Sequence, residues 1–267
     1  MNIIILTTDQ YRHKFLINYL ANQKKINIIA CFVEKKLHQN YQKNISFFQK
    51  KHFNIRSKKE KLFFLPKIKK KKLKNLFLIA PKQISKSDKV LKYLKKKNYD
   101  FVVSFGCSII PENVLEINKN KFLNIHLGLS PYYLGSGTNF WPFVNNELQF
   151  LGATIMRTSK KIDKGQVLHQ IRPDIKYGSD IHDIGNQIIF KIIKDIKFVL
   201  FNIHKLKNKF KFPKFKSKIF KRNDFDDQSL EKAYRNIQYG IINDYLDNKK
   251  YLEKKYKILN LKKLIKK

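Results

Sequence analysis

The sequence predicts an α/β protein with a Rossmann-like, open and mostly parallel sheet that carries helices on both faces. Two aliphatic runs, Asn2–Thr7 and Ile26–Val33, are interpreted as short buried strands because each is continuous and bounded by polar residues. Between them, large apolar residues recur at helical spacing from Tyr11 to Leu20. A strand, a helix and a second strand within about 33 residues form a βαβ unit, whose strands are parallel.

The next segments repeat this alternation after one irregular stretch. From Glu34 to Lys74 the pattern has no clean period, so helical pieces and a loop at the sheet edge are expected. Leu76–Ala80 and Asp100–Phe105 then predict strands on either side of a helix over Asp88–Lys97, and Phe122–Ile125 predicts another buried strand. The turn after the first strand reads TTDQYRH and contains no G-x-G-x-x-G, so a dinucleotide fingerprint is absent.

The second half of the chain begins with a Gly-rich loop, GLSPYYLGSGTNFWPF. Two strands, Gly152–Arg157 and Gln166–Ile171, are expected after it. A long helix should begin near Ser179, because one apolar stripe persists over about six turns, and the charged and aromatic tail should contain a helix around Ser229–Leu246. These patterns divide the chain into a domain over residues 1–205 and a short, partly helical C-terminal extension over residues 206–267.

The composition is strongly basic, with 57 Lys and Arg against 20 Asp and Glu, for a formal net charge of +37. Such a charge by itself favours polyanion binding. Only six of these residues are arginine, however, and the lysines are spread over every segment, which indicates compositional drift rather than a dedicated nucleic-acid surface. The run Lys69–Lys72 is interpreted as a solvated loop.

Cysteine content and hydropathy limit the class of protein further. Cys31 and Cys107 are too few for a disulfide framework or a thiolate metal cage, and no metal is expected. No unbroken apolar stretch approaches the roughly 18 residues of a membrane helix, and the opening residues lack a cationic leader. We therefore expect a cytoplasmic protein without a membrane span.

Three polar residues form the candidate site. Asn124 and His126 end a predicted buried strand, and Asp163 lies in a turn 37 residues after His126. Alternation places Asn124 and His126 on one face, and reactive groups in open parallel sheets gather beyond the carboxyl ends of strands. Together, an amide, an imidazole and a carboxylate can stabilise an oxyanion and move a proton, as acyl transfer to an amine requires. Taken singly, a histidine at a strand end is more often structural, and an aspartate beside a glycine usually belongs to a turn.

The segment NIHLGLSPYYLGSGTNFWPF, with GATIMRTSKKIDKGQVL after it, resembles the signature of the folate-dependent formyltransferase family. The resemblance covers residues 2–205 and is strongest from Asp100 to Ile171. It implies a formyltransferase fold, a catalytic domain over residues 1–205 and 10-formyltetrahydrofolate as the donor. Carried over residue by residue, it makes Asn124, His126 and Asp163 the catalytic trio.

The resemblance also implies where the pterin half of the donor binds. The matching positions are Cys107, Ser108, Ile109 and Ile110, the loop Gly128, Leu129, Ser130 and Pro131, and the segment Ser159, Lys160, Lys161 and Ile162. Cys107 is then a small lining residue rather than a reactive thiol. Trp141 and Tyr132 either form a wall of the acceptor side or belong to the core. Leu134 stands where many relatives place an arginine, and lysines surround Asp163, so the resemblance does not assign the identity of the acceptor.

The leading interpretation is an N-formyltransferase that acts on a primary amine of a small acceptor, an amino sugar nucleotide, because SGTNFWPF is most similar to that branch of the family. Methionyl-tRNA formylation is an alternative that the basic charge favours through phosphate contacts, and glycinamide ribonucleotide formylation is another. Against the tRNA acceptor, the C-terminal extension lacks the regular short strands of the β-barrel that tRNA-acting relatives carry. A non-catalytic basic nucleic-acid-binding protein is the alternative of a different class, and a homodimer is left open.

Overall fold

A seven-stranded sheet organises the part of the chain that the computed structural model describes, namely residues 1–35, 45–69, 73–96, 98–118, 120–161, 163–206 and 210–265. The strand order is β3-β2-β1-β4-β5-β7-β8. The first five strands of the sheet pair in parallel, and β7 runs antiparallel to both β5 and β8. The open, mostly parallel sheet predicted from the sequence is therefore confirmed. Its strands are β1 (Asn2–Thr8), β2 (Asn27–Glu34), β3 (Leu76–Ile79), β4 (Phe101–Phe105), β5 (Phe122–His126), β7 (Ala153–Arg157) and β8 (Val167–Ile171).

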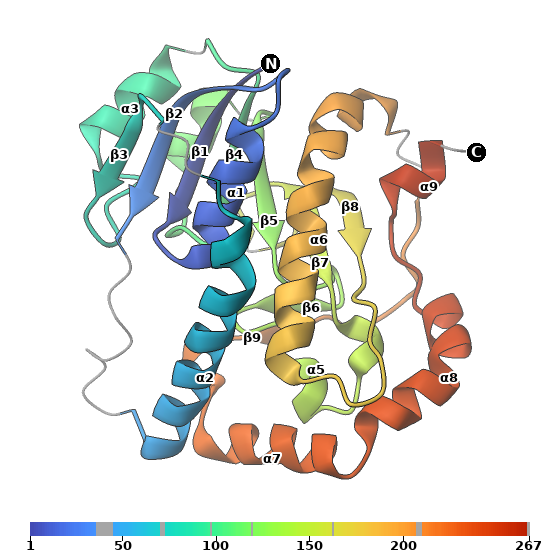
Figure 1. Ribbon diagram of the computed structural model, residues 1–267. Helices are drawn as coiled ribbons and strands as arrows, with labels where there is room; N and C mark the ends of the chain where they lie inside the picture. The colour runs from blue at the N-terminus through green and yellow to red at the C-terminus, as the bar shows by residue number, and fades with distance from the viewer. Residues whose placement is uncertain are drawn as a thin grey trace.

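Helices cover both faces of this sheet, as expected (Figure 1). Alternate residues of β1 point to opposite sides, so Ile3 and Ile5 enter the larger core while Ile4 and Leu6 enter the smaller one. The larger core also contains the inward faces of α1 and α6, and the smaller core contains those of α3 and α4. The helices are α1 (Tyr11–Ala21), α2 (Phe47–Phe64), α3 (Asp88–Lys95), α4 (Glu112–Leu115), α5 (Trp141–Val144), α6 (Ile181–Asn202), α7 (Asp227–Gln238), α8 (Ile241–Lys255) and α9 (Leu261–Ile265).

In the described residues 45–69 of the irregular stretch after β2, the long helix α2 leads directly into a 3-10 turn at Leu65–Lys67, where helical pieces and a loop were expected. Its N-cap is Ser46, whose hydroxyl accepts from the backbone N–H of Gln49 at 3.0 Å. The buried face of α2 contains Phe64, which is fully buried, and the polar residues His52 and Glu60. Because two of these buried positions are polar, the sequence of this long helix shows only a weak apolar periodicity. Of the run Lys69–Lys72, all but Lys69 lies outside the described residues.

The C-terminal segment packs against the larger core instead of standing apart from it. Leu230 and Ala233 of α7 and Leu261 of α9 are fully buried there. The single helix expected around residues 229–246 is two helices, because the chain turns at Gly240, whose φ of +90° lies in the left-handed region that glycine adopts without strain. Figure 1 shows α7 running below the N-terminal ends of α2 and α6.

A second, two-stranded sheet joins this segment to the Gly-rich loop. Strand β6 (Tyr133–Gly135) pairs in parallel with β9 (Lys218–Phe220), and neither strand was expected. Phe220 stacks on Trp141 with ring centroids 4.4 Å apart and an interplanar angle of 7°. Residues 79 to 85 positions apart in the sequence thus support the same loop.

None of the helices in the described ranges combines the length and the apolar character that a bilayer crossing needs.

Candidate active site

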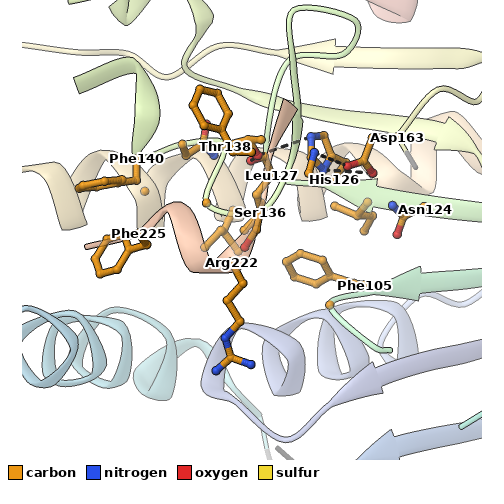
Figure 2. Close-up of a pocket in the computed structure, with 18 of the residues that line it drawn as sticks. Phe105, Asn124, His126, Leu127, Ser136, Thr138, Phe140, Asp163, Arg222 and Phe225 are labelled. Carbon is orange, nitrogen blue, oxygen red and sulfur yellow. Dashed lines mark hydrogen bonds and ion pairs between the residues drawn. The ribbon is translucent and has the colours of Figure 1, made fainter. Parts of the chain in front are cut away.

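A cavity of about 1420 Å³ opens at the carboxyl edge of the sheet (Figure 2). The ends of β4 and β5 form its floor, one face of α2 and the start of α6 form one side, and the segments after β6 and β9 form the other. This is the position where open α/β sheets bind their ligands, because loops diverge at the carboxyl ends of neighbouring strands. Asn124, His126 and Asp163 all line this cavity.

His126 and Asp163 form a direct pair, 3.4 Å apart between Nδ1 and Oδ1. His126 is the last residue of β5, and Asp163 lies in a turn at a φ of +52°. The other carboxylate oxygen of Asp163 accepts from the N–H of Gly135 at 2.9 Å. His126 Nε2 lies 3.2 Å from the carbonyl oxygen of Tyr133. Both ring nitrogens thus face oxygen acceptors, and the ring can donate to both only when it carries two protons.

Strand β6 therefore holds both members of this pair. Its first residue, Tyr133, provides the carbonyl oxygen opposite His126, and its last residue, Gly135, donates to Asp163. A side chain at Gly135 would place Cβ 2.2 Å from the carbonyl oxygen of Phe220 in β9, so only glycine fits between the two strands.

Asn124 lies two residues before His126 on the same face of β5 (Figure 2). Its Oδ1 accepts from the Ser104 hydroxyl at 3.1 Å, which fixes the orientation of the amide and leaves its NH₂ group as a donor at the cavity. The structure brings Asn124 into the same cavity as the pair, although the contact that it records directly is the one between His126 and Asp163.

The segment Cys107–Ile110 lines the cavity on the β4 side. It is held by Glu34, whose carboxylate accepts from both the N–H and the hydroxyl of Ser108, at 2.9 and 3.0 Å. Burial, and next the negative charge of Glu34, raise the pKa of the Cys107 thiol to about 12. Cys107 is therefore a neutral thiol at neutral pH, in agreement with a lining role rather than that of a nucleophile.

Only part of the segment 159–162, which the resemblance assigns to folate binding, lines the cavity. Ser159 and Lys160 line the cavity, and Lys160 forms ion pairs with Glu112 and Glu116 of the α4 region. Lys161 is exposed and does not line it, and Ile162 lies outside the described residues.

The loop Gly128–Pro131 lies behind the cavity wall. Leu129 and Ser130 are almost fully buried, and the backbone N–H of Ser130 donates to Thr154. Its contact with a folate remains a prediction. Its effect on the site is through Gly128, where a Cβ would lie 2.5 Å from His126 Nε2. Trp141 lines the cavity, whereas Tyr132 is fully buried in the larger core.

Sequence reasoning missed a polar face of α2 that lines the cavity. His52, Arg56 and Glu60 recur every four residues and are all lining residues. Arg12, in the first turn of α1, and Arg222, after β9, line it as well. The spacing of 52, 56 and 60 is a helical period in polar residues, and it was visible in the sequence as a signal for a helix that faces a site.

A sheet of this topology, with an amide, an imidazole and a carboxylate at its carboxyl edge, places this chain among the open α/β proteins whose ligand site lies between strand ends. Residues 1–192 match the family described as Formyl transferase, and because the match spans more than half of the chain, the chain belongs to that family. The resemblance inferred from the Asn124–Pro131 signature is thereby confirmed.

Two curated relatives illustrate the similarity. The chain is 38% identical over 113 residues to the Bifunctional polymyxin resistance protein ArnA of Wigglesworthia glossinidia brevipalpis, covering 42% of this chain and 17% of that protein. It is 37% identical over 108 residues to the Methionyl-tRNA formyltransferase of Thermodesulfovibrio yellowstonii, covering 39% and 34%. The matched region thus spans about a third or less of these two relatives.

Among solved structures, the fold is similar to that of a sugar N-formyltransferase from Shewanella sp, with a TM-score of 0.55. The sequence identity is 17%, and the similarity covers 88% of this chain and 87% of the other. At this identity the comparison shows that the two chains share a fold.

Proposed function

We propose that this protein transfers a formyl group from 10-formyltetrahydrofolate to a primary amine of a small acceptor, an amino sugar nucleotide. The observation that carries the proposal is the His126–Asp163 pair, 3.4 Å apart at the carboxyl edge, with Asn124 in the same cavity. The family of the chain supports the reaction class.

The chemistry assigns one role to each residue. The acceptor amine attacks the formyl carbon, a bond forms between them, and negative charge develops on the formyl oxygen. Asn124 can donate to that oxygen through its amide NH₂, and His126 can donate through a ring N–H. Asp163 orients the ring through its contact with Nδ1. The bond from the formyl carbon to the folate nitrogen then breaks, and the proton lost by the amine passes to that nitrogen, so tetrahydrofolate and a formamide are released.

The cavity fits the donor in size and lining. A volume of about 1420 Å³ exceeds the roughly 300–1,000 Å³ that is typical of a single ligand site, so it can hold a folate and an acceptor side by side. Cys107–Ile110, Ser159 and Lys160 line the cavity, and Cys107, Ile109 and Ile110 provide apolar side chains that suit a flat pterin.

An amino sugar nucleotide is favoured as acceptor by the form of the Gly-rich loop, SGTNFWPF, whose residues from Ser136 to Trp141 line the cavity. The similar fold of a sugar N-formyltransferase, over 88% of the chain, agrees with this choice. Methionyl-tRNA is the second candidate, because the net charge of +37 favours a polyanion and a methionyl-tRNA formyltransferase is among the relatives.

The proposal is tested with the purified chain, 10-formyltetrahydrofolate and three acceptors: an amino sugar nucleotide, methionyl-tRNA and glycinamide ribonucleotide. Formation of the formamide is measured by mass spectrometry, with His126→Ala as the inactive control. We expect the sugar nucleotide to be formylated fastest. A preference for methionyl-tRNA would replace the acceptor and keep the reaction.

Donor binding is measured separately by thermal shift with 5-formyltetrahydrofolate. A ligand at 100 times its Kd should stabilise the fold by about 2.7 kcal/mol. No shift at saturation, together with no formamide from any of the three acceptors, would overturn the proposed reaction and favour the non-catalytic alternative.

A further inference from the structure

Two arginines, Arg12 and Arg56, line the cavity away from the catalytic trio, and a single carboxylate, that of Glu60, lies near them. Arg12 forms an ion pair with Glu60, and their side chains are 6% and 7% exposed. Arg56 lies one turn before Glu60 on α2, and its guanidinium has no hydrogen-bond or ion-pair acceptor among the described residues. Arg56 is half-buried, so the charges of Arg12, Arg56 and Glu60 sum to one excess positive charge at the cavity wall.

The geometry of Arg12 also leaves one of its donors unused. Its two terminal nitrogens donate to Glu60 and Gln10, and its backbone N–H donates to Glu60 at 3.1 Å. Its Nε is buried and lacks a partner in the described part of the chain. Buried donors are almost always satisfied, so an orphaned guanidinium N–H at a cavity wall indicates an acceptor that comes from outside the chain.

The surroundings of Arg56 disfavour its charged form. Burial, and next the neighbouring charge of Arg12, lower the pKa of its guanidinium to about 10, against the opposing effect of Glu60. The guanidinium of Arg56 loses part of its hydration, and no carboxylate pairs with it in the described residues to compensate for that loss. An anion in the cavity would provide the compensating negative charge.

A third arginine reaches the cavity from the C-terminal segment. Figure 2 shows Arg222 extending from the chain after β9, with its guanidinium on the side of the cavity away from His126. Only six of the 57 basic residues are arginines, yet Arg12, Arg56 and Arg222 all line this cavity. In a chain that otherwise uses lysine, this concentration indicates a requirement for the guanidinium itself, whose planar set of donors matches phosphate oxygens two at a time.

We propose that Arg12, Arg56 and Arg222 form a subsite that binds a phosphate or diphosphate group of the acceptor. The inference rests on the proposed function, since it treats the amine substrate as a phosphorylated molecule. Glu60 holds Arg12 in place and balances one charge, and the phosphate balances the other. His52, one turn before Arg56, lines the same wall. Its pKa is lowered to about 3, mainly by burial, so it adds no charge to the subsite near neutral pH.

Inorganic diphosphate is the probe for this subsite, because its binding can be measured without any formyl transfer. Wild-type protein should gain thermal stability with diphosphate, and Arg56→Gln should lose that gain. Without ligand, Arg56→Gln should melt at a higher temperature than wild type, because it removes a half-buried charge that lies next to the charge of Arg12 and has no ion-pair partner in the described residues. Arg235→Gln is the matched control, since Arg235 is exposed on α7 and pairs with Glu231. It should retain the diphosphate response.

Kinetics then identify which substrate provides the anion. Arg56→Gln should raise the KM for the amino sugar nucleotide by about 10- to 100-fold, with kcat within about threefold, because it removes binding that ground state and transition state share. The affinity for 5-formyltetrahydrofolate should not change. Weakened folate binding with an unchanged acceptor KM would assign the arginines to the carboxylates of the folate tail and overturn the proposal.

The two proposals fail in different ways. A diphosphate response that is lost in Arg56→Gln, without formyl transfer to any amine, would keep the subsite and overturn the reaction. Formyl transfer without a diphosphate response, and with a lower melting temperature in Arg56→Gln, would show that Arg56 is structural and overturn the subsite.

Discussion

Gly128→Ala should displace the histidine of the proposed catalytic pair without removing any polar group from the site. A Cβ at this position would lie 2.5 Å from His126 Nε2 and 2.5 Å from the Thr138 hydroxyl, whereas ordinary van der Waals contact begins near 3.4 Å. Either the imidazole or the loop must therefore move by about 0.9 Å. The loop has little freedom, because Leu129 and Ser130 on its far side are almost fully buried. The imidazole and the Thr138 side chain, which meet the added Cβ at the same distance, are therefore the parts that move.

The displacement gives the expected size of the effect. A misplacement of about 1 Å in a catalytic group can reduce a rate by about 10²-fold, because proton transfer and oxyanion donation both depend on distance. We therefore expect kcat for formyl transfer to fall by about 10²-fold in Gly128→Ala. The Kd for 5-formyltetrahydrofolate should change much less, since Gly128 does not line the cavity.

Gly178→Ala is the matched control for Gly128→Ala. Gly178 has a φ of +72° and no atom within 4 Å of an added Cβ, so alanine there is strained but meets nothing. This variant should lose about 1–2 kcal/mol of stability and keep its kcat. If Gly128→Ala kept a wild-type kcat while its crystal structure showed the ring displaced, the positioning of His126 would not govern the reaction, and the reasoning would be refuted.

Three further outcomes are expected. His126→Ala and Asn124→Ala should each lower kcat by at least about 10²-fold in the formyl-transfer assay, with circular dichroism unchanged, since each removes a donor aimed at the oxyanion; wild-type rates in both would exclude the assigned roles. His52 has its pKa lowered from 6.5 to about 3, mainly by burial and next by the charge of His182, so the unfolded chain binds more protons between these values. Urea unfolding should therefore show stability falling on acidification from about pH 6.5 to 3, by up to about 1.4 kcal/mol per pH unit, and this slope should flatten in His52→Gln. Phe220→Ala removes the ring that stacks on Trp141 and on a tyrosine of β6, and it should reduce kcat more than folate affinity; an equal loss of both would indicate general unfolding.

The parts of the fold that could be predicted are those whose pattern is local. Aliphatic runs such as Asn2–Thr7 identify buried parallel strands without reference to the rest of the chain, and the isoleucine stripe of α6 identifies a helix in the same way. Helix α2 was not recognised as one element, since the face that it buries carries His52 and Glu60 where an apolar stripe was sought. Strands β6 and β9 have three residues each and depend on a partner far along the chain, so no local period marks them.

The candidate site shows the same limit. Asn124 and His126 could be located because strand alternation relates them directly, and Asp163 was connected to them through the resemblance. The arginine subsite could not be located, because Arg12, Arg56 and Arg222 come from three separate segments that meet only in the folded chain. Lysine run lengths and net charge, the most visible basic features of the sequence, do not point to it.

The pairing of β6 with β9 has a consequence for the order in which the site matures during synthesis. A nascent chain that has reached the end of α6 already contains Asn124, His126 and Asp163, and it contains the whole region that matches the family. In the described residues, however, the strand that holds His126 and Asp163 finds its pairing partner only at Lys218–Phe220. Because domains fold as units while translation proceeds at about 5–20 residues per second, the sheet can assemble before this partner exists. A segment that leaves the ribosome after the matched region thus completes the site that the earlier segments encode.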